Sequence, residues 1–112
     1  MSIRNDIRNR NFETVAARLD SYISLATHVN SGRSSLLSGL AELTNIVMTP
    51  VRFQSEFDAL IPVLRKLTAL DPDLYMGHVW LAEALRRKHP EEALAHIRKA
   101  IHLVNSDDRA YR

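Results

Sequence analysis

The sequence contains no cysteine, and this absence excludes several classes of protein. A chain without cysteine has no disulfide framework, no thiolate nucleophile and no cysteine-ligated zinc site. Three glycines and four prolines are too few for a turn-rich β-sandwich or a low-complexity linker. The apolar runs are only a few residues long, so we expect no membrane insertion. No apolar stretch follows the charged first residues, which argues against a secretory signal and, together with the lack of cysteine, favours a cytoplasmic protein.

The length and the charge are those of one ordinary globular domain. The chain has 112 residues, of which 46% are hydrophobic and 25% are charged, and these fractions match average globular proteins. Fifteen lysines and arginines against thirteen acidic residues give a formal net charge of +2. A net charge this small requires no polyanionic partner.

Helical periodicity runs through most of the chain. From Phe12 onward, apolar residues recur at intervals of three and four, with charged residues between them. No segment alternates between apolar and polar residues over a useful length, so the predicted fold class is all-α. We expect five antiparallel helices over about residues 12–26, 35–48, 52–70, 74–88 and 90–104. Pro62 lies inside the third of them, where we expect a kink rather than a break.

A shift of 34 residues aligns one helix and the turn after it with a later part of the chain. The shift places Ala59, Leu60, Val63, Leu67 and Leu70 on Ala93, Leu94, Ile97, Ile101 and Val104. It also places Asp71 and Asp73 on Asn105 and Asp107. Two unrelated amphipathic helices would share the apolar spacing, but they would not share the polar terminator at the same offset. The chain is therefore predicted to contain an internal repeat.

The repeated unit resembles the tetratricopeptide repeat, a pair of antiparallel helices of about 34 residues. Leu81-Ala82-Glu83-Ala84-Leu85 is similar to the first helix of that repeat, with the small Ala82 at its tight-packing position. Glu91-Glu92-Ala93-Leu94 is similar to the second helix, and Leu70-Asp71-Pro72-Asp73 is similar to the turn between repeats. The resemblance covers about residues 60–111 and implies a right-handed stack of helical hairpins in the C-terminal half.

The sequence thus predicts a single helical domain over residues 1–112. Residues 1–33 would form an N-terminal helix and a linker, residues 34–72 a helical hairpin, and residues 73–108 a second hairpin that resembles the tetratricopeptide repeat. Asp71-Pro72-Asp73 separates the two hairpins, because proline does not continue a helix easily and the residue before it avoids helical geometry.

The resemblance implies a non-enzymatic protein-interaction module or adaptor. Stacked helical pairs form a groove that binds a peptide or a helix of a protein partner. The family's groove positions match Met76, Val79, Glu83 and Arg86. Met76 would supply an adaptable apolar contact, and the two charged residues would recognise charge on the partner. The competing interpretation is that Met76 and Val79 are simply core residues. The last helix has no following helix to cover it, so its exposed side could also join two copies as a homodimer.

Two other function classes stay open. The resemblance implies an accessory or regulatory domain of an enzyme complex as an alternative, because such repeats often accompany catalytic domains such as glycosyltransferases. Nucleic-acid binding is less favoured. Basic residues gather at Arg4, Arg8 and Arg10 and again at residues 86–88, but they lack the interleaved aromatics on which single strands stack. The second cluster also lies at a helix C-terminus, where the helix dipole favours cations.

No constellation of residues indicates catalysis, a metal or a cofactor. His96 and His102 are six residues apart and face different sides of a helix, so we expect the five histidines to be solvated or to cap helices. Carboxylate pairs occur at Asp71 and Asp73, Glu91 and Glu92, and Asp107 and Asp108. Each pair lies near a predicted helix start, where capping accounts for it. We expect no enzymatic activity, no metal and no cofactor.

Overall fold

The computed structural model describes residues 3–29 and 32–110, and the regular structure within these ranges is entirely helical. Six helices follow one another: α1 (Ile3–Arg8), α2 (Phe12–His28), α3 (Arg33–Met48), α4 (Gln54–Leu70), α5 (Tyr75–Leu85) and α6 (Pro90–Ala110). The predicted all-α class is confirmed for this part of the chain. None of these helices has the length and apolarity that a membrane crossing requires.

Within the described residues the structure has one helix more than the five that the sequence predicted, and this additional helix is α1. α1 has six residues, too few for its apolar spacing to be recognised in the sequence, and Ile3 and Ile7 pack on the core. The chain then reverses at Arg10, whose φ of 56° is the left-handed conformation that residues other than glycine adopt only at a cost. At the other end, α6 continues to Ala110, past the predicted end at residue 104. α4 passes through Pro62 as one helix.

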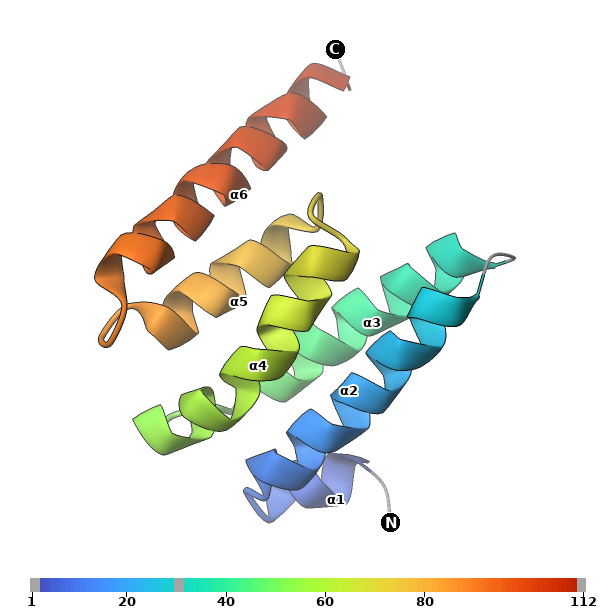
Figure 1. The fold of residues 1–112 in the computed structure, drawn as a ribbon, viewed down its shortest axis with the longest axis vertical. Coiled ribbons are helices and arrows are strands. Elements are labelled where there is room, and N and C mark those ends of the chain that lie inside the picture. The colour runs from blue at the N-terminus through green and yellow to red at the C-terminus, as the bar shows by residue number, and fades with distance from the viewer. Residues whose placement is uncertain (1–2, 30–31, 111–112) are drawn as a thin grey trace.

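From α2 to α6 the helices lie side by side and run alternately up and down (Figure 1). α2 packs on α3 and α4, while α5 packs on α4, on α6 and on part of α3. Residues 34–72, which were predicted to form a hairpin, contain α3 and α4, and both of these helices pack on α2 and α5. α6 packs on α5 at one edge of the array and reaches α4 through an ion pair of 2.9 Å between Arg65 Nη2 and Glu92 Oε1.

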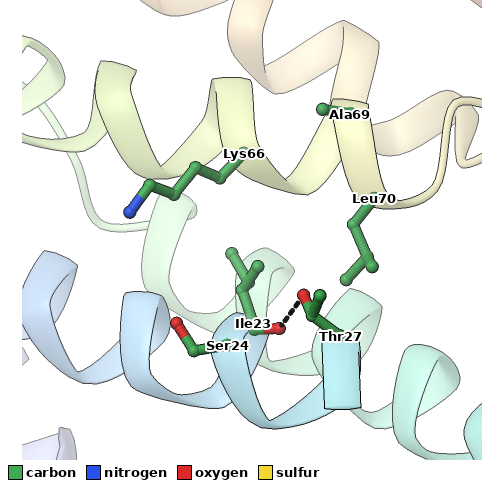
Figure 2. A pocket seen from close by; sticks show the side chains of 6 residues that line it. All are labelled: Ile23, Ser24, Thr27, Lys66, Ala69 and Leu70. Carbon is green, nitrogen blue, oxygen red and sulfur yellow. Dashed lines mark hydrogen bonds between the residues drawn. The ribbon is translucent and has the colours of Figure 1, made fainter. Parts of the chain in front are cut away.

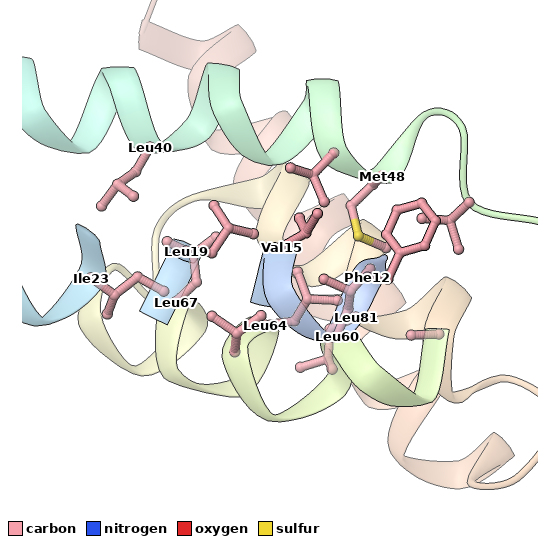
Figure 3. Packing of buried hydrophobic residues seen from close by; sticks show 14 of the residues in the cluster. Phe12, Val15, Leu19, Ile23, Leu40, Met48, Leu60, Leu64, Leu67 and Leu81 are labelled. Atoms are coloured by element: carbon pink, nitrogen blue, oxygen red, sulfur yellow. The ribbon is translucent and has the colours of Figure 1, made fainter. Parts of the chain in front are cut away.

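The hydrophobic core lies where α2, α3, α4 and α5 meet (Figure 3). The apolar residues of α2 and α4 that recur at intervals of three and four face one another there, so the periodicity seen in the sequence determines which sides of these helices pack. Burying one large aliphatic side chain contributes about 1.5–3 kcal/mol. Among the buried side chains are Phe12, Val15, Leu19, Ile23, Leu40, Met48, Leu60, Leu64, Leu67 and Leu81.

Arg10 ties the turn between α1 and α2 to the start of α4. Its Nε and Nη2 donate to the Glu56 carboxylate at 2.7 and 2.5 Å, and Nη2 also donates to the carbonyl of Pro50 at 3.1 Å. Glu56 is buried, and its Oε1 accepts the backbone N–H groups of Arg52 and Phe53 as well. The hydrogen bonds from Arg10 lower the pKa of the Glu56 carboxyl, although burial alone would raise it.

Two more polar contacts join neighbouring helices. Arg18 Nε of α2 donates to the buried Asp6 of α1 at 2.8 Å. Trp80 Nε1 of α5 donates to Asn45 Oδ1 of α3 at 2.7 Å. Each contact gives a partner to a polar group that would otherwise be costly to remove from water.

Candidate protein-interaction face

α5 and its C-cap residue Arg86 carry the four residues predicted to bind a partner, and their spacing of three, four and three places them on one helix face. Met76, Val79 and Glu83 are partly exposed, and Arg86 is exposed. Neither Met76 nor Val79 belongs to the core cluster of the described residues. Leu81 of α5 is fully buried in the core. The four predicted residues lie on another side of the helix from Leu81.

α6 carries a row of exposed apolar side chains, here called the α6 stripe. The α6 stripe consists of Leu94, Ile97, Ile101 and Val104, which are 49%, 39%, 56% and 39% exposed. Ala93 and Ala100 lie beside the α6 stripe and are buried, and their small side chains let α6 approach α5 closely. Single exposed apolar residues are ordinary, whereas a continuous exposed row makes this side of α6 a candidate interaction surface.

A cleft of about 230 Å³, here called the α5/α6 cleft, lies beside the α6 stripe. It is lined by Ala82, Glu83, Arg86, Pro90, Ala93, Leu94 and Ile97. Glu83 Oε1 lies 3.5 Å from Arg86 Nε within its wall. The structure thus brings Glu83 and Arg86 together with the α6 stripe. Met76 and Val79 do not line the cleft. Val79 lies about one turn and Met76 about two turns before Glu83 on the same face of α5.

Two histidines meet between α5 and α6, contrary to the expectation that all five are solvated or cap helices. His78 is buried, with its Nε2 at 2.8 Å from the carbonyl oxygen of Pro72 and its Nδ1 at 2.9 Å from His96 Nδ1. Because a carbonyl only accepts, His78 donates from Nε2, and the two Nδ1 atoms share a proton that either ring can carry. Burial, and after it the charge of His78, lowers the pKa of His96, against the opposing effect of Glu92. Spacing along one helix gives no sign of this pair, because the two histidines lie on different helices.

An open hollow of about 480 Å³ lies between α2 and α4 (Figure 2). It is lined by Ile23, Ser24, Thr27, Lys66, Ala69 and Leu70. Its charged residue, Lys66, donates to Asp20 at 2.6 Å, and the Thr27 hydroxyl donates to the carbonyl of Ile23 at 3.0 Å. These polar groups therefore serve the fold. Across the described ranges, no group of three or more histidine or acidic side chains could hold a metal ion.

The carboxylate pairs do not all cap helices as predicted. Glu91 and Glu92 do occupy the first turn of α6, and Asp71 ends α4. Asp73 does not cap α5, because Leu74 precedes that helix and no side chain bonds to its free N–H groups. Asp107 and Asp108 lie on the helical backbone of α6, and their side chains lie outside the described part of the structure.

Nothing matches this chain among protein-family models, curated proteins or solved structures. The resemblance to the tetratricopeptide repeat therefore rests on the residues of this chain alone. What bears on function is the geometry itself, in which an apolar row on α6 borders a cleft and a partly charged face on α5.

Proposed function

We propose that the protein is a non-enzymatic interaction module that binds an amphipathic helix of a partner protein along the α6 stripe and the neighbouring face of α5. One observation carries this proposal: two helices that share an apolar pattern differ in burial. Leu60, Val63 and Leu67 of α4 are 0%, 4% and 2% exposed, while their counterparts under the 34-residue shift are Leu94, Ile97 and Ile101 of the α6 stripe.

The environment of the two helices explains the difference in burial. α4 lies between α2 and α5, whereas α6 packs mainly on α5. A partner helix along the α6 stripe would bury its apolar side chains, as α2 and α5 bury those of α4. Apolar residues at this spacing are what one helix offers to another in a groove, and each Å² of apolar area removed from water contributes about 25 cal/mol. Met76 and Val79 would extend the contact along α5.

A matched pair of substitutions on α6 tests this proposal. Ile101→Asp places one negative charge in the α6 stripe, and Ala95→Asp places one at an exposed position on another side of the same helix. We expect the wild type and Ala95→Asp to retain the same partner from native extract, and Ile101→Asp to lose it, as quantified by mass spectrometry. Both variants should melt close to the wild type, because exposed substitutions change stability by only about 0.5 kcal/mol.

Equal retention by Ile101→Asp would contradict the proposal, as would global unfolding of that variant. Sedimentation of the purified chain separates a second possibility. A dimer that forms at high concentration and dissociates in Ile101→Asp would make the occupant of the α6 stripe a second copy of this chain. Met76→Ala would then show whether α5 takes part, through weaker partner binding at an unchanged melting temperature.

A further inference from the structure

A second cleft, here called the arginine cleft, adjoins the α5/α6 cleft at the C-terminal end of α5. It measures about 140 Å³ and is lined by Val51, Arg52, Gln54, Phe57, Glu83, Arg86 and Arg87. Glu83 and Arg86 line both clefts. An apolar cavity and a basic one therefore share a wall, close enough for one ligand to enter both.

The arginine cleft holds positive charge that the fold does not use. Three arginines and one glutamate line it, and the contact of Arg86 with Glu83 is long, at 3.5 Å. The side chains of Arg52 and Arg87 have no hydrogen bond or ion pair with any described residue. A helix C-terminus favours Arg86 and Arg87 in any case, but Arg52 comes from the segment before α4 and is not explained in this way.

On the basis of the interaction module proposed above, we infer that the partner is an acidic amphipathic helix, which sets an apolar side chain in the α5/α6 cleft and a carboxylate in the arginine cleft. The planar fork of a guanidinium matches a carboxylate and binds it through two hydrogen bonds. The arginine cleft is smaller than the roughly 300–1,000 Å³ of small-molecule sites, so it suits a single acidic side chain. A free inorganic anion would leave the apolar cleft and the α6 stripe uncovered.

Selection from a displayed library of helical peptides tests both levels of this argument. Peptides of about 18 residues span roughly 27 Å as a helix, longer than the α6 stripe. On the wild-type chain we expect enriched peptides with an apolar row and with Asp or Glu about one turn from it. On the double variant Arg52→Gln/Arg87→Gln we expect the apolar row to persist and the acidic enrichment to disappear. Arg4→Gln/Arg8→Gln removes the same charge from exposed positions of α1 and is the control.

Affinities of one selected peptide make the test quantitative. By fluorescence anisotropy, replacing the enriched acid with Gln should weaken binding to the wild type roughly tenfold, equivalent to about 1.4 kcal/mol. The same replacement should have little effect on binding to Arg52→Gln/Arg87→Gln. The loss of affinity that this replacement causes on the wild type should also become smaller as the salt concentration rises, because salt screens charge pairs at a protein surface.

Different results overturn different claims. Apolar peptides without acidic enrichment, or an equal loss in the Arg4→Gln/Arg8→Gln control, would overturn the acidic anchor and leave the interaction module standing. Failure to enrich any apolar row would overturn both. Salt-dependent retention of a labelled oligonucleotide that requires Arg52 and Arg87 would assign the arginine cleft to phosphate and reject an acidic helix.

Discussion

α4 and α6 carry matching apolar patterns, yet one helix is interior and the other forms an edge. Within the described residues, α4 packs on α2 and α5 and its aliphatic row closes the core, whereas α6 packs mainly on α5 and the equivalent row is 39–56% exposed. An amphipathic pattern thus specifies which side of a helix must be covered, but not which element covers it. In α4 the chain itself provides the cover, and in α6 we propose that another protein does.

The largest expected effect is a difference in stability between equivalent truncations in the two helices. Leu67→Ala removes a buried side chain from α4 and should lower the free energy of unfolding by about 3 kcal/mol, because a cavity is left in the core. Ile101→Ala, at the matching position of α6, should change it by only about 0.5 kcal/mol. Urea unfolding followed by circular dichroism measures both. Equal losses would show that the α6 stripe is covered in solution, for instance by a second copy.

A smaller effect on stability is expected at the start of α4, where Arg10 binds Glu56. The pKa of Glu56 is lowered from 4.5, so the unfolded chain binds its proton more readily and stability falls as pH drops below about that value. Arg10→Met should lower the urea midpoint of unfolding at neutral pH, and this midpoint should then fall less steeply in acid than in the wild type. Part of the fall in acid should remain, because Lys88 lowers the pKa of Asp58 in the same way. Arg8→Met, an exposed arginine on α1, is the control. An unchanged acid profile in Arg10→Met would contradict this account.

The smallest effect is expected on the α6 side, at the histidine pair. The pKa of His96 is lowered from 6.5, so the folded chain resists its protonation, and stability should decline as pH falls below about that value. His78, Glu92 and Arg65 are the charged and titratable groups that act on it. Amide protection factors, which correct for the slower intrinsic exchange in acid, should fall in α6 before α4 between neutral and mildly acidic pH, and His96→Gln should reduce this difference. His28→Gln, on the exposed end of α2, should leave it intact.

The parts of the fold that depend on local pattern were predictable. The all-α class and the approximate positions of α2 to α6 follow from apolar spacing, and proline and glycine mark the breaks between them. α1 was missed because six residues carry too little periodicity. Tertiary partners were also out of reach, since nothing in the spacing indicates that Arg10 binds Glu56 or that His78 meets His96.

The same limit applies to the candidate site. Glu83 and Arg86 were identified because they match groove positions of the repeat family that the sequence resembles, and the structure places both in the wall of the α5/α6 cleft. Arg52 was overlooked, because it lies between α3 and α4 and joins Arg86 and Arg87 only through the packing of α4 on α5. A sequence pattern identifies residues that share one helix, whereas the residues that line a cavity come from several segments of the chain.

The single tryptophan gives the molecule an internal optical reporter. Trp80 bonds to Asn45 across the contact between α5 and α3, so its emission will shift when those helices separate. The α6 stripe is formed by a different helix at the edge of the array. Titration with a ligand that covers the α6 stripe alone should therefore leave the indole spectrum nearly constant, a ligand that also covers Met76 and Val79 should perturb it, and denaturation should move it to longer wavelength.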